Sequence, residues 1–363
     1  MLASTKPKDK NLVSVLVRTT FRASLSRAIR SVDVQSYRPI EIVLVDALGG
    51  GQSFPRTGAD GIEFAPISKG HALSRSAAAN VAVAAARGSL LVFLDDDDTF
   101  DPGHVFSLTR TLALNPDARL AYSGSQMIDS SGVCVGKVHE HFSPMRLFRR
   151  NYLTMGSVLF ARDLLDSGCR FDEELEGLED WDFWLQALRH TRFAFSGEDT
   201  YLWNVAEGES GFGVGTNRDE SRFRQAQSRL IEKWGGAFEK LGKDFSDFAN
   251  SGVVREKIGE TQAAETDYRR ALAIDPDSVN VLNRLALLLV KQRRFAEGDS
   301  LLTRAIGSDP QNTDLRINRA VLFETAGRKN DAAQILKEIL AVDPRHERAL
   351  EIAKKLQISG PGR

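Results

Sequence analysis

The first part of the chain alternates short apolar runs with stretches in which apolar residues recur at helical spacing. The apolar runs are LVSVLV at 12–17, IEIVLVDA at 40–47, GIEFAPI at 61–67 and SLLVFLDDDD at 89–98. Helical spacing is found at 21–35 and again at 75–88. Buried strands interleaved with helices are typical of a parallel sheet covered on both faces. The pattern therefore predicts an α/β fold whose ligands bind beyond the carboxyl ends of the strands.

The last third of the chain has no strand pattern and repeats with a period of 34 residues. Pro276, Pro310 and Pro344 stand 34 residues apart, each directly after an aspartate. Large side chains recur in the same register, and small residues recur between them; the large ones are Tyr268, Leu302 and Leu336. A 34-residue period is that of the tetratricopeptide helix pair. We therefore expect an all-α domain at 245–357, with three repeats and a solvating end helix.

A glycine-rich segment, GFGVGTN at 211–217, separates the two parts and is predicted to be a mobile linker. The following residues, 218–236, read as an amphipathic helix that closes the first domain. The α/β domain is therefore predicted to span 10–240.

Four consecutive aspartates, Asp95 to Asp98, follow the fourth apolar run. Adjacent carboxylates repel one another, and burying any of them without a partner is costly. The run is therefore either a solvated turn or a site for a cation. Hard Mg²⁺ or Mn²⁺ prefers carboxylate oxygens, and two overlapping Asp-x-Asp pairs at a strand end would supply them. The position at a strand end favours the cation site.

Five segments stand in a fixed order: VSVLVRTTFR, EIVLVDA, SAAANVAVAAARG, FLDDDD and GLEDWDFWLQAL. This ordered set resembles the family-2 glycosyltransferases over about residues 10–205. The resemblance implies a nucleotide-diphospho-sugar transferase fold of the GT-A, Rossmann-like kind. It also implies inverting, metal-dependent transfer of a sugar from a nucleotide-sugar donor to an acceptor hydroxyl, as in cell-surface polysaccharide or glycoconjugate synthesis.

The resemblance assigns roles to two of the four aspartates. The family pattern Leu-Asp-x-Asp-Asp places Asp95 at the nucleotide ribose and Asp97 on the metal, Mg²⁺ or Mn²⁺. Asp98 would be a reserve ligand, and Asp96 would point elsewhere. In this region of the family's fold, Thr19 of VRTTFR would line the nucleotide pocket; here Arg18 replaces the proline of the family's Pro-Thr-Tyr-Asn.

Two further residues are candidates for the nucleotide. Asp46 matches the first acid of the family's Val-Asp-Asp-Gly-Ser segment, which contacts the base. The chain reads VDALGGG there, without the second aspartate and the serine, and a strand-end cap explains Asp46 equally well. Arg75 in LSRSAAAN would meet an anionic ligand, or is a surface arginine.

The candidate general base lies in LEDWDFW, where Asp180 matches the aspartate of the family's Glu-Asp pair. An inverting reaction needs a base on the face opposite the leaving group. Trp181 and Trp184 fit either a partly desolvated carboxylate or a stacking platform for a sugar ring. The same acids also favour the first turn of a helix whose aromatic residues face the core, and both interpretations can hold together.

Composition and charge limit the classes of binding partner that the protein can have. The net charge of −1 gives no overall field that would recruit nucleic acid or an anionic membrane. Two cysteines are too few for a disulfide framework, the N-terminus lacks the apolar core of a signal peptide, and no stretch approaches the about 20 apolar residues that span a bilayer. We expect a cytoplasmic protein, free or peripheral to the membrane. Its partners would be a nucleotide sugar, a glycan, lipid-linked or protein acceptor, and a protein on the repeat surface.

Two other functions stay open. The altered VDALGGG segment and the absence of the family's arginine before Asn80 favour a catalytically inactive scaffold that binds partners through its repeats. The retained Asp95, Asp97 and Asp180 favour an enzyme. A nucleotidyltransferase would need a glycine-rich phosphate loop near the N-terminus, and VRTTFR has no glycine.

Overall fold

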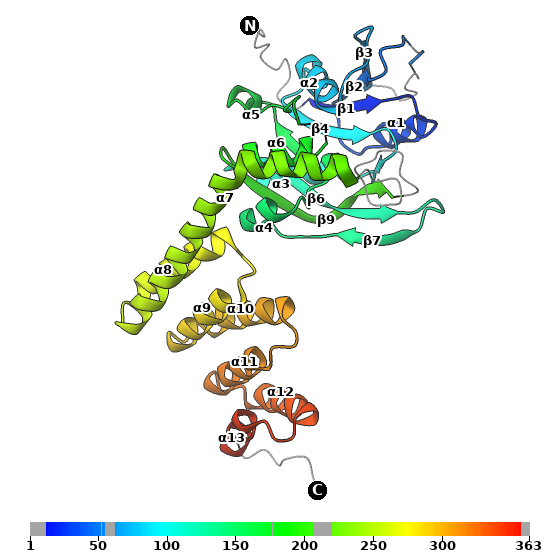
Figure 1. The fold of residues 1–363 in the computed structure, drawn as a ribbon. Coiled ribbons are helices and arrows are strands. Elements are labelled where there is room, and N and C mark those ends of the chain that lie inside the picture. The colour runs from blue at the N-terminus through cyan, green and yellow to red at the C-terminus, as the bar shows by residue number, and fades with distance from the viewer. Residues whose placement is uncertain (1–11, 52, 55–61, 176, 206–219, 357–363) are drawn as a thin grey trace. The chain divides into compact units, whose positions relative to one another are not determined.

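The structure is a computed structural model that describes residues 12–51, 53–54, 62–175, 177–205 and 220–356 (Figure 1). The chain divides into two compact units, the first reaching Gly235 and the second beginning at Gly236, with residues 143–146 grouped with the second. The predicted linker at 211–217 lies outside the described residues.

The first unit is built on a mixed sheet that has nine strands within the described residues. The strand order is β3-β2-β1-β4-β8-β6-β9-β5, and β7 pairs with β6. The strands are β1 (Val13–Thr19), β2 (Ile40–Asp46), β3 (Ile62–Ser68), β4 (Leu90–Asp95), β5 (Thr99–Phe100), β6 (Ala118–Ile128), β7 (Cys134–Val138), β8 (Val158–Ala161) and β9 (Arg192–Asn204). The four apolar runs of the sequence form β1 to β4, which pair in parallel as predicted. Beyond β4 the sheet is mixed, because β8 runs antiparallel to both of its neighbours.

Helices cover both faces of this sheet. They are α1 (Leu25–Asp33), α2 (Arg75–Ala85), α3 (His104–Leu114), α4 (Pro144–Arg149), α5 (Asp163–Asp166), α6 (Glu179–Ala187) and the start of α7 (Glu220–Lys257), with a short 3₁₀ turn, η1 (Met155–Ser157). Every residue of β1 and β2 is buried. Their alternate side chains enter two separate cores, one shared with α2 and α6 and the other with α1 and α3. This alternation follows from the two-residue period of a strand.

The topology of the sheet fixes where a ligand can bind. The chain passes from β1 to β2 and β3 on one side, and then crosses to β4 on the other side of β1. In open α/β sheets, ligands bind at such a reversal, beyond the carboxyl ends of the strands. Thr19 ends β1 and Asp95 ends β4, and Arg18 is the register partner of Asp95. The candidate site residues therefore lie at the edge of the sheet where a ligand is expected to bind.

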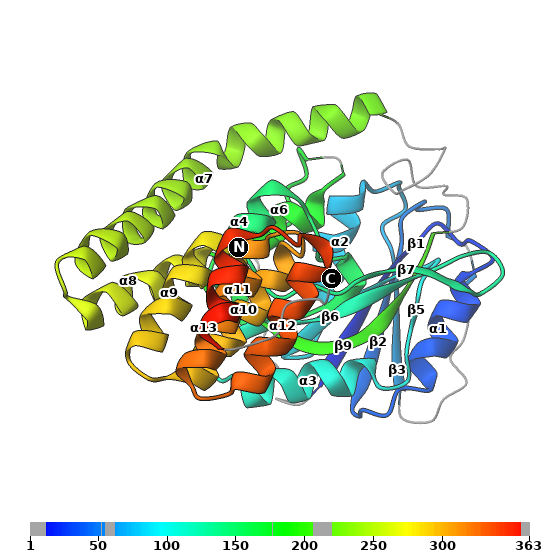
Figure 2. The ribbon, with the colours of Figure 1, turned by 90° about the horizontal axis from the view of Figure 1, so that it is seen from below.

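The second unit is all-helical. It comprises the later part of α7 and α8 (Thr261–Ile274), α9 (Val279–Lys291), α10 (Phe295–Ser308), α11 (Thr313–Thr325), α12 (Lys329–Val342) and α13 (Glu347–Lys355). Helices adjacent in sequence from α8 to α13 pack together, and α11 also packs against α9 and α13 (Figure 2). Tyr268, Leu302 and Leu336, the large residues of the 34-residue period, are fully buried. A Cβ on Gly252 would lie 2.6 Å from the Tyr268 ring, which explains the small residue there.

One helix is longer than predicted. The helix expected to end at 236 continues through Gly235 and Gly236 to Lys257. Each glycine costs a helix about 1 kcal/mol relative to alanine. Packing on both sides offsets this cost, since Trp234 lies in the core of the first unit and Phe248 packs on a core of the second. No helix among the described residues is long and apolar enough to cross a membrane.

Candidate active site

The four aspartates after β4 have alternating environments. Asp96 and Asp98 are buried, each with 4% of its surface exposed. The side chains of Asp95 and Asp97 are 24% and 34% exposed. The run is therefore neither a solvated turn nor a uniformly buried cluster, because two carboxylates turn inward and two stay accessible.

Asp96 links the end of β1 to the end of β4 through hydrogen bonds. Its Oδ2 accepts hydrogen bonds from the Thr19 hydroxyl at 2.7 Å and from the Thr20 backbone amide at 3.1 Å. The Thr19 hydroxyl in turn accepts the Phe21 amide at 2.7 Å, where Phe21 has a left-handed φ of 60°. Thr19 is 1% exposed. Its side chain is thus engaged within the protein, and its predicted contact with a nucleotide stays a prediction.

Asp98 turns toward β9. Its carboxylate accepts hydrogen bonds from the Tyr201 hydroxyl and from the Asn204 amide, the latter at 2.7 Å. Burial and the charges of Asp95 and Asp97 raise the pKa of Asp98 well above its usual range. The expectation of a reserve metal ligand at Asp98 finds no support, because its carboxylate is occupied by the partners on β9.

Asp95 belongs to a network of two acids and two arginines. Arg18 donates to Asp95 Oδ1 at 2.9 Å and to Glu179 Oε1 at 2.8 Å, while Arg75 Nε lies 3.3 Å from the same Glu179 oxygen. Burial opposes ionisation of both acids. The arginine charges outweigh burial, so that the pKa values of Asp95 and Glu179 both lie below their usual range. The end of β4 and the start of α6 are therefore joined through one buried guanidinium.

Asp97 has a different partner, Arg22, whose Nη1 lies 2.5 Å from Asp97 Oδ2. Burial and the charges of Asp95 and Asp96 raise the pKa of Asp97, although Arg22 opposes the rise. One carboxylate oxygen of Asp95 and one of Asp97 accept no hydrogen bond from another side chain among the described residues. These oxygens are ligands of the type that Mg²⁺ and Mn²⁺ take, and a cation would relieve the repulsion that raises the pKa of Asp97. No group of three or more acidic, histidine or cysteine side chains within the described residues is arranged to hold a metal. Other ligands would have to come from elsewhere, such as a bound phosphate.

Asp46 is completely buried and serves the loop that follows β2. Its carboxylate accepts the backbone amides of Leu48 and Gly49, both at 2.9 Å, and the Ser68 hydroxyl at 3.0 Å. Burial opposes these donors, which nevertheless lower the pKa of Asp46. The strand-end cap is thus the local role that the structure shows, and contact with a nucleotide base stays a prediction.

Asp180 lies in the first turn of α6, beside Glu179. Its Oδ1 accepts the Trp181 amide at 2.7 Å, and its Oδ2 accepts the side-chain amide of Asn151 at 2.9 Å. Burial, together with the charge of Glu179, raises the pKa of Asp180 to about 7. A carboxylate of this pKa exchanges a proton near neutral pH, which suits a general base.

The two tryptophans beside Asp180 have a structural role. The Trp181 indole donates to the Leu147 carbonyl at 2.6 Å, and the Trp184 indole donates to the Leu153 carbonyl at 3.1 Å. Trp181 is 5% exposed and Trp184 is fully buried. The interpretation of these rings as a stacking platform for a sugar is therefore wrong, and the alternative of a desolvated environment for Asp180 fits.

Sequence reasoning missed two residues of the site. Arg18 was noted only as a departure from the family's proline, although an arginine at the end of a buried strand signals an acidic partner. Asn151 lies in an irregular segment between α4 and η1. Nothing in the local sequence marks it, because the fold alone brings it to Asp180.

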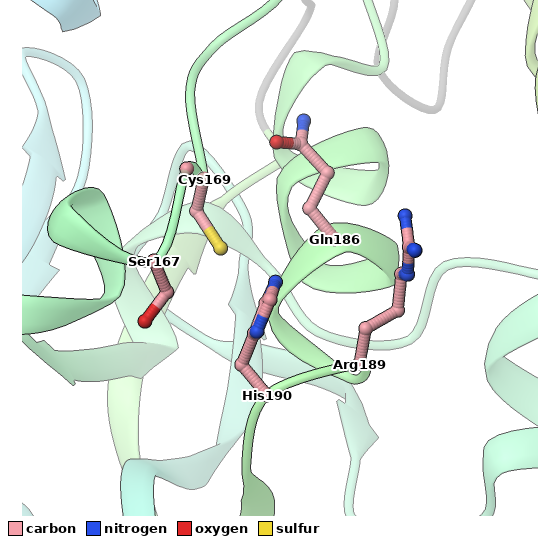
Figure 3. Close-up of a pocket in the computed structure, with 6 residues that line it drawn as sticks. Ser167, Cys169, Gln186, Arg189 and His190 are labelled. Atoms are coloured by element: carbon pink, nitrogen blue, oxygen red, sulfur yellow. The ribbon is translucent and has the colours of Figure 1, made fainter.

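A separate pocket of about 250 Å³ lies at the other end of α6 (Figure 3). It is lined by Ser167, Gly168, Cys169, Gln186, Arg189 and His190. None of the predicted site residues lines it, since Asp180 belongs to the N-terminal turn of the helix. Burial raises the pKa of the Cys169 thiol, so this cysteine is no activated nucleophile.

Comparison with protein families supports the family-2 glycosyltransferase resemblance rather than a nucleotidyltransferase. Residues 14–131 match the model of glycosyl transferase family 2, and residues 248–278 and 289–356 match two models of the tetratricopeptide repeat. The N-terminal part of the chain is thus similar to family-2 glycosyltransferases, and the C-terminal part is similar to tetratricopeptide repeats. The resemblance and the fold class predicted from the sequence are confirmed.

Individual relatives are distant. An uncharacterized protein of Sinorhizobium fredii is 26% identical over 225 residues, which are 58% of this chain and 24% of that protein. The uncharacterized glycosyltransferase YwdF of Bacillus subtilis is 26% identical over 190 residues, which are 50% of this chain and 69% of that one. The chain thus spans about a quarter of the length of the first of these relatives. Among solved structures, residues 1–349 of TarS from S. aureus give a TM-score of 0.45 at 16% identity, covering 88% of each chain.

Proposed function

We propose that this protein is an inverting glycosyltransferase that transfers a sugar from a nucleotide-sugar donor to an acceptor hydroxyl. Asp180 is the general base, Asp97 holds a divalent cation, and Asp95 faces the nucleotide ribose. Arg75 is the cation for the anionic donor, while Thr19 and Asp46 shape the nucleotide pocket through the turns that they hold together. The acceptor is a glycan, a lipid-linked sugar or a protein.

One observation carries this proposal. A single guanidinium, that of Arg18, contacts Asp95 at 2.9 Å and Glu179 at 2.8 Å, and Glu179 directly precedes Asp180. The residues are 77 and 161 positions from Arg18 in sequence, so only the fold brings them together. Arg18 thus links the end of β4, which carries the acid proposed for the donor, to the first turn of α6, which carries the acid proposed for the acceptor. A displacement at the anomeric carbon would need both acids at one site.

The proposed chemistry follows from the protonation states. Asp180, with a pKa of about 7, accepts the proton of the acceptor hydroxyl as that oxygen attacks the sugar. Arg18 and Arg75 keep Glu179 ionised, so Glu179 does not compete for this proton. A divalent cation at Asp97 would neutralise the charge that develops on the departing diphosphate. The repeats would offer a surface for a partner protein or for a polymeric acceptor.

The test combines donor binding and transfer. A set of nucleotide sugars, with and without Mn²⁺, is screened for an increase in the thermal unfolding midpoint, since a ligand that binds only the folded state raises it. We expect one donor to raise the midpoint in the presence of Mn²⁺, and Asp97→Asn to lose this Mn²⁺-dependent increase. Asp180→Asn should keep donor binding and lose transfer by about 10²-fold or more. Asp117→Asn, at an exposed position, is the matched control.

Full transfer activity in Asp180→Asn would overturn the assignment of the base, and an unchanged Mn²⁺ response in Asp97→Asn would overturn that of the cation ligand.

A second function, that of an inactive scaffold, has specific observations in its favour. The Asp46 carboxylate is occupied by its own loop and Asp97 is paired with Arg22, as in a domain that has become a scaffold. That function predicts no response of the wild-type protein to any donor, together with partner binding through the repeats.

A further inference from the structure

The segment between α4 and η1 places one amide side chain against the proposed base. Asn151 Nδ2 lies 2.9 Å from Asp180 Oδ2. We infer that Asn151 is a positioning residue of the transferase, which fixes the orientation of the Asp180 carboxylate and favours its proton-accepting form. This inference rests on the proposed function, in which Asp180 is the base.

The orientation of the amide follows from its other contact. The backbone amide of Leu153 donates to Asn151 Oδ1 at 3.1 Å. A backbone N–H can only donate, so the oxygen of Asn151 must face Leu153 and its NH₂ group must face Asp180. An NH₂ group has no lone pair for a carboxylic acid proton, whereas its hydrogen bond to a charged carboxylate is charge-assisted and therefore stronger. The contact thus favours the ionised form of Asp180.

Helix α6 itself holds the segment in place. The indoles of Trp181 and Trp184 donate to the carbonyls of Leu147 and Leu153, which lie on either side of Asn151 in sequence. The two tryptophans are three positions apart and therefore project from neighbouring positions on the helix surface. The residues that flank and follow the base thus fix the distance between the base and Asn151.

The two hydrogen bonds leave room for a substrate. The Trp181 backbone N–H donates to Asp180 Oδ1 and Asn151 donates to Oδ2, so each oxygen has one donor among the residues that the structure describes. A carboxylate has about four lone-pair positions, and an acceptor hydroxyl can still approach one of them. Asn151 therefore aligns the carboxylate without blocking it.

The charged groups around Asp180 act in opposite directions. Glu179, on the same helix, raises the pKa of Asp180, in addition to the effect of burial. Arg75 on α2 lowers it, and so does the hydrogen bond from Asn151. Arg18 on β1 contacts Glu179 rather than Asp180. Two neutral donors, the Trp181 backbone amide and the Asn151 side chain, also lower the pKa of Asp180. Of these two, the Asn151 donor can be removed by substitution without changing any charge.

The test is the pH profile of kcat for Asn151→Leu, which keeps a similar volume and removes the donor. A hydrogen bond to a charged group contributes enough to shift a pKa by about one unit. We expect the acidic limb of the kcat profile to move up by about one pH unit, with about tenfold lower kcat at pH 6 and recovery at pH 8.5. Asn151→Asp, which places a like charge beside the base, should move the limb further in the same direction. Asn115→Leu, whose amide bonds only a carbonyl of its own helix, is the control and should leave the limb unchanged.

A purely structural role of Asn151 would lower kcat equally at every pH, and that result overturns the inference. Should Asn151→Leu fail to fold, Trp184→Phe removes the bond to the Leu153 carbonyl while keeping an aromatic ring, and it should shift the limb in the same direction by less. Carbon-13 NMR titration of the Asp180 carboxyl, assigned by comparison with Asp180→Asn, needs no activity. A higher Asp180 pKa in Asn151→Leu with no transfer in the wild type would refute the proposed function alone. An unchanged Asp180 pKa would refute the inference itself.

Discussion

The elevated pKa of Asp180 predicts that the proposed base destabilises the domain that contains it. In the unfolded chain this carboxyl has an ordinary pKa of 3.8, and in the folded protein its pKa is about 7. Between these values the folded state binds more protons than the unfolded state. Stability therefore falls as the pH rises from about 4 to about 7, and the loss is complete above the folded pKa.

The size of the effect follows from the same two values. Each pKa unit corresponds to about 1.4 kcal/mol, which sets a ceiling of about 4 kcal/mol on the cost of ionised Asp180 at pH 8. The titration of Asp180 is coupled to that of the neighbouring Glu179, so the two acids share part of this cost. Asp180→Asn keeps the shape and cannot ionise. We expect this variant to be more stable than the wild type by about 1–3 kcal/mol at pH 8, and by no more than about 1 kcal/mol at pH 4.5.

The position of the tryptophans provides the assay. All four, Trp181, Trp184, Trp203 and Trp234, lie in the first unit. Denaturant unfolding followed by tryptophan fluorescence therefore reports on the glycosyltransferase domain alone, at pH 4.5 and at pH 8. Glu198→Gln, which neutralises an exposed acid of the same domain, is the control and should change stability by less than about 0.5 kcal/mol. An Asp180→Asn variant no more stable than the wild type at pH 8, or equally stabilised at both pH values, would refute the reasoning.

Two further substitutions test the packing around and beyond the site. Tyr201→Phe removes the hydroxyl that donates to the buried Asp98 carboxylate, and it should lower the free energy of unfolding of the first unit by about 1–3 kcal/mol, measured by tryptophan fluorescence. Leu302→Ala opens a cavity at a fully buried position of the repeats and should cost about 2–5 kcal/mol, measured by far-UV circular dichroism; Val342→Ala, at an exposed position, should cost less than about 0.5 kcal/mol.

The sequence predicts the parts of this fold that have a period. The strands β1, β2 and β4 are apolar at most positions because both faces of the sheet are covered there, and the sequence shows them as continuous apolar runs. The repeats show a 34-residue period in the sequence because each helix pair must bury the same face. The strands from β5 onward were mostly not predicted. The two residues of β5 and the exposed edge strand β7 carry no apolar period, since tertiary pairing alone makes them strands.

The candidate site divides in the same way. The positions of Asp95 and Asp180 at the ends of regular elements could be predicted from the sequence. Their partners could not. Arg18 meets Glu179 across 161 residues, and Asn151 meets Asp180 only because two indoles hold an irregular segment in place. Such contacts depend on how whole helices and strands pack together, and a local pattern of residues does not predict that packing.

The balance of charges around the site gives a reason for a cation to bind together with the donor. Within the described residues, three arginines face the acids at the ends of β4 and at the start of α6; they are Arg18, Arg22 and Arg75, and the acids that they contact are Asp95, Asp96, Asp97 and Glu179. These arginine charges are therefore already matched by carboxylates.

A nucleotide sugar would bring a diphosphate and add negative charge beside Asp95 and Asp97. Repulsion in a partly buried site is costly, so binding of the donor would either draw an arginine away from its carboxylate or bring in a positive charge from solution. Withdrawal of Arg18 would leave the buried Glu179 with one cation fewer, whereas a divalent cation between Asp97 and the phosphates leaves that pairing intact. The charge balance thus favours donor and cation entering together, which is the cooperative response that the Mn²⁺ screen measures.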